Sequence, residues 1–233
     1  MRYNEHMKKI IFGIFAHPDD EAFGPAATLL HETKQGSELH LICLTAGEAG
    51  VNPDNHDDLA AVRLEEWRAA GALIGATSMH HLGYTDGRLC NNDYHEIAGE
   101  ITKIVNDVVQ AQTEPVEIEF MSMDFNGVTG HIDHIVAARV AAFVFYQQRE
   151  LDRNMTRMLL ACVPESEAPK PNTDWLYMDA GRDENVCQRT EFPELHDQVI
   201  EIMRAHHSQR SDGETHIKNR GDMLTANYFM ILG

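Results

Sequence analysis

Hydrophobic and polar positions follow a regular order through the first two-thirds of the chain, in which strand-length apolar runs alternate with longer helix-length segments. The apolar runs predict strands over residues 10–16, 39–45, 79–82 and 116–123. The intervening segments predict a helix opened by Gly24-Pro25 and further helices over residues 59–74, 94–110 and about 131–151. This order predicts an α/β class, a Rossmann-like three-layer fold with a mostly parallel sheet.

The last third of the chain is less regular. Residues 158–163 predict another strand, residues 192–207 a helix, and residues 224–232 a final strand or docking segment. A stretch rich in Pro and Glu, residues 164–172, predicts a loop. Because no repeat or linker divides the sequence, residues 1–233 are expected to form one domain.

Composition narrows the classes of function. The chain has 233 residues, 43% of them hydrophobic, which suits one soluble domain with a substantial core. Its formal net charge is -18, so binding to nucleic acid or to an anionic membrane is not expected, and a neutral or cationic small substrate fits better. No apolar stretch approaches the ~20 residues that are needed to span a bilayer.

The spacing of the cysteines predicts the cellular compartment of the protein. Cys43, Cys90, Cys162 and Cys187 are widely spaced in the sequence and form no Cys-x-x-Cys pair, which predicts a reducing cytoplasm. The apolar run 10–16 passes directly into a polar motif without a small-residue cleavage pattern, so it is interpreted as a first strand and not as a signal peptide.

Polar side chains gather where the first predicted strand ends, in the stretch His17-Pro18-Asp19-Asp20-Glu21. Ligands of open α/β sheets bind at the carboxyl ends of the strands, so this position suits a site. His17 and Asp20 are close enough to reach one ion, and catalytic zinc typically has three His or carboxylate ligands plus a water. The alternative is that Asp19 and Asp20 only cap the following helix.

A second cluster opens the helix after the fourth predicted strand. His131 and His134 are three residues apart, so they lie on one face of that helix and can look into the same cleft, with Asp133 between them. A single His at a helix start is more often a cap or a surface residue. Two of them with an Asp, again past a strand end, favour a metal site shared with the first cluster.

Together these clusters resemble the signature pair of the LmbE-like (PIG-L) family of zinc-dependent N-deacetylases, the N-acetylglucosaminyl deacetylase type. Three further stretches resemble family motifs in the expected order: Thr45 to Gly50 (T-x-G-E-x-G), Arg63-x-x-Glu66 and His206-x-Ser208-Gln209. The resemblance covers nearly the whole chain. One position departs from it, because Ile132 stands where Pro is common in the second cluster.

The resemblance implies a role for each residue of the two clusters. It implies Zn²⁺ as the cofactor, held by His17, Asp20 and His134. It implies Asp19 as the general base and His131 as a general acid or oxyanion partner, with Asp133 orienting His131. Zinc lowers the pKa of its bound water to about 7, so metal-activated water would attack the acetamide of an N-acetylglucosamine-type substrate. A protonated His131 would stabilise the oxyanion, and His131 or Asp19 would deliver a proton to the leaving amine.

Two further side chains are candidates for substrate binding. Arg63 offers a guanidinium fork to sugar hydroxyls or to a charged aglycone, and the alternative is a surface ion pair with Glu65 or Glu66. Glu48 either closes over the substrate or is a solvated loop residue.

Other functions stay open on the residues alone. One is a Mg- or Mn-dependent phosphoesterase, and another is a catalytically silent metal- or sugar-binding module on the same fold. Two imidazoles among three ligands favour zinc, and a base at Asp19 favours catalysis. The expected partner is a small N-acetylated amino sugar whose aglycone is an inositol, a malate, a second sugar or an antibiotic precursor. The resemblance also implies a homo-oligomer.

Overall fold

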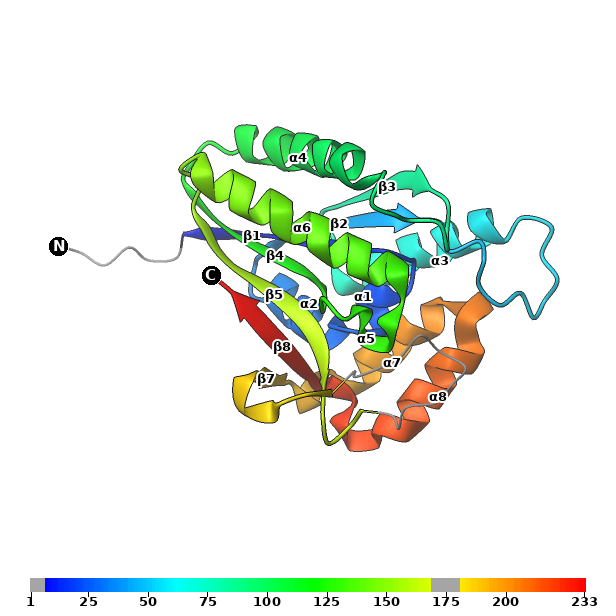
Figure 1. Ribbon diagram of the computed structural model, residues 1–233. Coiled ribbons are helices and arrows are strands. Elements are labelled where there is room, and N and C mark those ends of the chain that lie inside the picture. The colour runs from blue at the N-terminus through cyan, green and yellow to red at the C-terminus, as the bar shows by residue number, and fades with distance from the viewer. Residues whose placement is uncertain (1–6, 169–180) are drawn as a thin grey trace.

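The computed structural model describes residues 7–168 and 181–233. In this part of the chain the strands form one sheet in the order β3-β2-β1-β4-β5-β8-β7, with β6 paired to β5 (Figure 1). The first five strands of this order are parallel, and β8 and β7 are antiparallel to their neighbours. The strands are β1 (Lys8–Phe15), β2 (Glu38–Thr45), β3 (Ser78–Tyr84), β4 (Val116–Met123), β5 (Met155–Pro164), β6 (Gly181–Arg182), β7 (Gln188–Glu191) and β8 (Ala226–Leu232).

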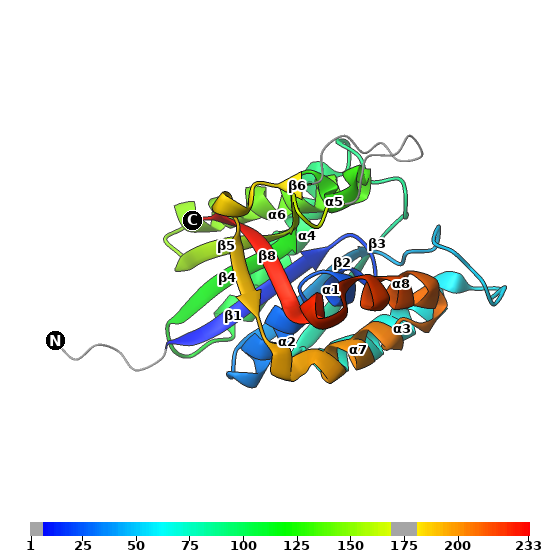
Figure 2. The ribbon, with the colours of Figure 1, turned by 90° about the horizontal axis from the view of Figure 1, so that it is seen from below.

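Helices cover both faces of the sheet (Figures 1 and 2). Helices α4 and α6 lie on one face, and α2, α3 and α7 lie on the other with α8 beside α7. The α-helices are α1 (Asp20–Phe23), α2 (Ala26–Lys34), α3 (Leu59–Ile74), α4 (Tyr94–Gln110), α5 (Gly127–Gly130), α6 (Ile132–Glu150), α7 (His196–Ala205) and α8 (Arg210–Arg220). Short 3-10 turns cover Glu184–Val186, Pro193–Leu195, His207–Gln209 and Gly221–Thr225. Within the described residues, no helix combines the length and the apolar character that crossing a membrane would require.

The three layers follow from the side chains of the central strand. Along β1, Ile10, Phe12 and Ile14 belong to the core cluster under α4 and α6, whereas Ile11 and Phe15 belong to the cluster under α2, α3 and α7. Successive side chains of a strand point to opposite faces, so a strand that is buried on both faces needs a continuous apolar run. The prediction of a three-layer α/β fold is confirmed.

The order of the strands creates a switch point beside β1. The chain runs outward from β1 to β2 and β3, and it then returns to place β4 on the other side of β1. Residues Phe12 and Phe120 are register partners across this pair. The loops that follow β1 and β4 therefore leave the sheet next to each other, at the place where open α/β sheets bind ligands.

Sequence periodicity predicted the early elements closely. The helices over 59–74 and 94–110 and the strand over 116–123 are confirmed with their predicted bounds. Helix α8 was not predicted, because it is polar on all sides and offers no apolar stripe to recognise. The predicted loop over residues 164–172 lies partly outside the described residues, and one domain over residues 1–233 stays a prediction.

Two cysteines that are distant in the sequence meet in the fold. The Sγ atoms of Cys162, on β5, and Cys187, just before β7, lie 3.6 Å apart, and both thiols are free. Sequence spacing does not reveal this proximity. The two cysteines meet because β8 pairs with both β5 and β7. The compartment stays a prediction.

The aromatic centre of the core gives a test of the fold. Phe120 is fully buried, with its ring 5.5 Å from that of Phe12 and 5.9 Å from that of Phe145. We expect Phe120→Ala to lower the free energy of unfolding by about 3–5 kcal/mol through lost burial and a new cavity. Phe143→Ala is the matched control, because Phe143 is 39% exposed. Urea denaturation measures both, and equal losses would contradict this description of the core.

Candidate active site

His17 lies two residues past the end of β1, and it is buried. Its Nε2 lies 2.9 Å from Oδ1 of Asp86 and 3.3 Å from Oδ2 of Asp133. Carboxylates only accept, so Nε2 carries the proton and Nδ1 is left to face the cluster. Burial lowers the pKa of His17, but the hydrogen bonds to Asp133 and Asp86 and the charge of Asp20 outweigh it and raise the pKa to about 10. A cation at Nδ1 would take the place of the second proton.

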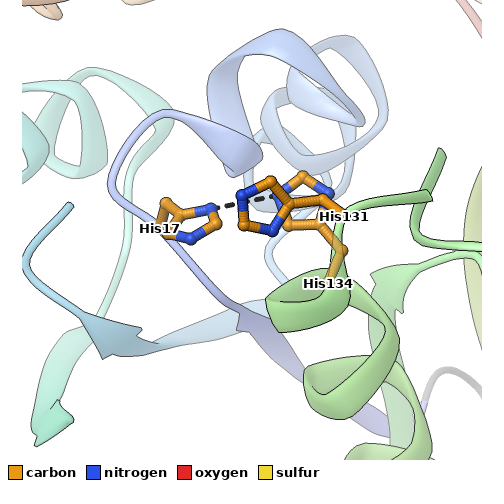
Figure 3. A group of neighbouring side chains, drawn as sticks. All are labelled: His17, His131 and His134. Carbon is orange, nitrogen blue, oxygen red and sulfur yellow. Dashed lines mark hydrogen bonds between the residues drawn. The ribbon is translucent and has the colours of Figure 1, made fainter. Parts of the chain in front are cut away.

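Two more donor atoms meet Nδ1 of His17. Nε2 of His134 lies 3.0 Å from it (Figure 3). Oδ1 of Asp20 lies 3.1 Å from the same His134 nitrogen. Nδ1 of His134 donates to the carbonyl of Gly127 at 3.1 Å, which leaves Nε2 as the free lone pair. Two imidazole nitrogens and a carboxylate oxygen therefore face one another. This donor set fits a divalent cation.

Asp20 is held in place by the backbone. Its Oδ2 accepts from the N–H groups of Ala16 and His17 at 3.1 and 3.0 Å, so Oδ1 is directed at His134. Burial raises the pKa of Asp20, but the charges and hydrogen bonds of His134 and His17 outweigh it and hold the pKa well below its usual range. Asp19 is the N-cap residue of α1, and its side chain makes no cap hydrogen bond. The side chains of Asp19 and Asp20 therefore make other contacts than the helix-cap hydrogen bonds of the alternative interpretation.

Asp19 lies beside the cluster in an unusual backbone conformation. Its φ is 114°, in the region that favours glycine. Its Oδ2 accepts from Nη2 of Arg63 at 2.8 Å, and Oδ1 makes no hydrogen bond to the described residues. Burial raises the pKa of Asp19 to about 6, against the opposing charge of Arg63. Strain of this kind is concentrated at functional sites, where surrounding contacts maintain it.

His131 stands at the start of α6 and faces the other two imidazoles (Figure 3). Its ring centroid lies 4.8 Å from that of His17 and 4.9 Å from that of His134. Its Nδ1 accepts from the backbone N–H of Asp133 at 3.2 Å, so the proton is on Nε2. Burial lowers the pKa of His131, as do the charges of His134 and His17. Ring nitrogens of the three histidines also come within 4.8 Å of one another, which makes His131 an alternative third ligand to Asp20.

The resemblance implied that Asp133 orients His131. The carboxylate of Asp133 instead contacts other groups. Its Oδ2 contacts Nε2 of His17 at 3.3 Å and accepts from the N–H of Gly87, and its Oδ1 accepts from the N–H of Leu89. Asp133 therefore fixes the orientation of His17. Asp86 shares this task and was missed by the sequence analysis, although its place just past the end of β3 was a usable signal.

Arg63 is not a surface residue, and neither Glu65 nor Glu66 is its partner. It is buried, Nη1 donates to the carbonyl of Gly47, and Nη2 donates to the carbonyl of Pro18 and to Asp19. A Cβ atom at Gly47 would collide with the guanidinium, so the glycine is required by this close approach. With both terminal nitrogens occupied, Arg63 is suited to orient Asp19, and direct binding of substrate stays a prediction that its contacts do not favour.

Glu48 is exposed, and its carboxylate accepts from the backbone N–H of Asp86 at 2.8 Å. It is not among the residues that line the cavity beside the cluster. In this structure Glu48 therefore ties the loop after β2 to the loop after β3, and closure over a substrate stays a prediction.

The motif His206-x-Ser208-Gln209 contacts the segment after β1. Nε2 of His206 lies 2.8 Å from Oε1 of Glu21, and both side chains are fully buried. Ser208 donates to Glu66 through its backbone N–H and its hydroxyl at 2.8 and 2.6 Å. Residues that resemble two other motifs are thus hydrogen-bonded to the one segment that carries His206 and Ser208.

A cavity of about 970 Å³ opens beside the cluster. His17, Asp19, Asp20, His131 and His134 line one end of it, and side chains of α8 line another part. Its size is in the range of small-molecule sites. A metal-ligand cluster at the switch point of an α/β sheet, with a carboxylate beside it and a cavity in front, is the arrangement of a metal-dependent hydrolase.

The chain belongs to the PIG-L family, described as GlcNAc-PI de-N-acetylase, whose model matches residues 12–145. This match covers more than half of the 233 residues. The resemblance seen in the sequence is therefore confirmed.

Two relatives are deacetylases by name. The chain is 31% identical over 185 residues to the 1D-myo-inositol 2-acetamido-2-deoxy-alpha-D-glucopyranoside deacetylase of Acidothermus cellulolyticus, covering 69% of this chain and 60% of that protein. It is 26% identical over 216 residues to the probable N-acetyl-alpha-D-glucosaminyl L-malate deacetylase 2 of Bacillus anthracis, covering 88% and 83%. The chain thus spans less than two thirds of the first relative's length.

Solved structures share the fold at low identity. The N,N'-diacetylchitobiose deacetylase of Pyrococcus horikoshii matches with a TM-score of 0.68 at 18% identity, covering 97% of this chain and 84% of that one. A 4-carboxy-2-hydroxymuconate hydratase of Pseudomonas putida matches with a TM-score of 0.65 at 14% identity, covering 97% of both. Because these likenesses span two kinds of reaction, they support the fold alone.

The two candidate third ligands can be separated by metal content. We expect His134→Ala to abolish stable metal binding, since it removes a nitrogen from the centre of the cluster, and His131→Ala to retain the metal. Elemental analysis of each variant after zinc loading and dialysis measures this. Loss of metal from the His131 variant together with its retention after Asp20→Ala would favour the three-histidine set instead.

The role of Asp133 behind His17 gives a second test. We expect Asp133→Asn to weaken zinc affinity by about 10–100-fold, because an acceptor that fixes the imidazole is lost. Glu48→Gln removes a charge from an exposed loop and should leave the affinity unchanged. Competition with a fluorescent zinc chelator measures both, and an unchanged affinity in the Asp133 variant would contradict the orienting role.

Proposed function

We propose that this protein is a zinc-dependent hydrolase that removes the acetyl group from an N-acetylglucosamine-type substrate. The observation that carries the proposal is the group of donor atoms from His17, Asp20 and His134, which face one another at the end of a cavity with Asp19 alongside. The family and the names of the two relatives support the same reaction class.

The donor set supports zinc as the metal. Two neutral imidazoles and one carboxylate suit zinc better than magnesium or calcium, which prefer oxygen ligands. When bound, the ion would acidify a water and polarise the acetamide carbonyl. Asp86 and Asp133 contribute by holding the imidazole of His17 so that Nδ1 faces the ion.

Asp19 is the proposed general base. Its Oδ2 is held by Arg63, while Oδ1 has no hydrogen-bond partner among the described residues and the side chain lines the cavity. A pKa near 6 leaves the carboxylate ionised at neutral pH and still basic enough to take a proton. Arg63 in this scheme positions the base.

His131 is the proposed oxyanion partner, and Asp19 returns to the leaving amine the proton that it takes from the water. Because Nδ1 accepts from the backbone, Nε2–H is the group available to donate into the cavity. A neutral imidazole that donates through Nε2 replaces the protonated form expected from the sequence. Hydrogen-bond donors aimed at the developing oxyanion stabilise the transition state of acyl transfer.

Assembly and compartment complete the proposal. The family resemblance supports a homo-oligomer. The wide spacing of the four cysteines in the sequence supports a cytoplasmic protein.

The base assignment is tested by Asp19→Asn, which keeps the shape of the side chain. We expect this variant to retain zinc and to lose about 100-fold or more in kcat, because general base catalysis contributes at least that much. Acetate release from N-acetylglucosaminides and zinc content are measured on the same samples. Parental activity in Asp19→Asn would refute the assignment.

The same samples separate the alternative functions. Turnover of a phosphate ester without acetate release would favour the phosphoesterase, and zinc binding without either activity would favour a silent binding module.

A further inference from the structure

One face of α8 forms part of the cavity wall. Asp212, Thr215, His216 and Asn219 all line the cavity that contains the donor cluster. They stand at positions i, i+3, i+4 and i+7, so they share one side of the helix. Phe23 lines the cavity as well, and its ring lies 6.3 Å from that of His216 in a nearly parallel arrangement. The cavity therefore extends beyond the reacting centre to a polar wall with an aromatic neighbour.

Most polar side chains on this face have no hydrogen-bond partner among the described residues. Asp212, His216 and Asn219 make no side-chain hydrogen bond to residues 7–168 or 181–233, whereas the Thr215 hydroxyl donates to the carbonyl of Ser211 at 2.7 Å. A carboxylate, an amide and an imidazole provide both donors and acceptors. Such a mixed set matches hydroxyl groups, which donate and accept.

The two arginines among the described residues that line the cavity are each paired with an acid. Arg220 pairs with Glu167 at 2.7 Å, and it donates to the carbonyls of Met223 and Ala226 at 2.9 and 2.6 Å. The terminal nitrogens of Arg63 are occupied by Asp19 and by two backbone carbonyls, and its Nε is buried. No lysine lines the cavity among the described residues. An anionic ligand would thus find no guanidinium or ammonium without a partner in this part of the chain.

His216 does not supply a positive charge for an anionic ligand. Burial lowers the pKa of His216 to about 4, and the charge of Arg220 acts in the same direction, so the imidazole is neutral at pH 7. Asp212 adds a carboxylate that forms no ion pair with residues 7–168 or 181–233. A negatively charged aglycone would face this carboxylate without compensation.

We propose, resting on the deacetylase function above, that the group attached to the amino sugar is an uncharged polyol or sugar whose hydroxyls bind Asp212, His216 and Asn219 on α8. The same face disfavours a carboxylate-bearing aglycone. Helix α8 is therefore the specificity-determining element of the site.

The test compares two glycosides of N-acetylglucosamine that differ in the aglycone, myo-inositol or L-malate. We expect kcat/KM for the inositol glycoside to exceed that for the malate glycoside by about tenfold or more, because the anion lacks a cationic partner. Asp212→Lys should lower this ratio by about tenfold or more through KM, since it replaces the uncompensated carboxylate by an ammonium group. Asp222→Lys makes the same change of charge outside the cavity lining and should keep the parental ratio.

Affinities are measured in parallel by calorimetry on the zinc-loaded Asp19→Asn variant, so the preference is obtained whether or not either glycoside is hydrolysed. Absence of acetate release from both glycosides with the parent would refute the deacetylase function. A preference for the malate glycoside, or equal binding of the two, would overturn the inference about the aglycone. Equal ratios in Asp212→Lys and Asp222→Lys would overturn the assignment to α8.

Discussion

The pairing of β1 with β4 is the constraint on which the rest of the site depends. It brings together His17 and His134, which are 117 residues apart in the chain, with 3.0 Å between ring nitrogens. The strands that lead to them are largely apolar and buried on both faces, and the donor groups stand past the strand ends. Behind each imidazole an acceptor binds one ring N–H, and this leaves the other ring nitrogen of each directed at the same point.

Charge in this region is balanced at short range. Asp19 lies against Arg63, and Glu21 lies against His206 with both side chains fully buried. Removal of one member of a buried pair leaves the other uncompensated, which costs about 3–5 kcal/mol. The late segment around His206 and Ser208 therefore belongs to the site although it never reaches the cluster, because it supports the loop that carries Asp19 and Asp20.

The sequence predicted the fold class, the long helices and the residues of the cluster, since apolar periodicity and motif position carry that information. It did not predict the directions of side chains. Asp133 and Arg63 were recognised as notable residues, yet their contacts with His17 and Asp19 depend on which strands are neighbours. Asp86 and α8 were missed for different reasons: the first is a single acid in a polar loop, and the second has no apolar face.

The backbone conformation of Asp19 sets stability against function at one position. At a φ of 114° a glycine would be unstrained, whereas any residue with a Cβ is strained. Selection for thermal stability alone would thus favour glycine here, and it would remove the carboxylate that Arg63 holds in place. The loop keeps an acid in a conformation that its own backbone disfavours, so its shape is maintained by the buried pairs around it and not by local preference.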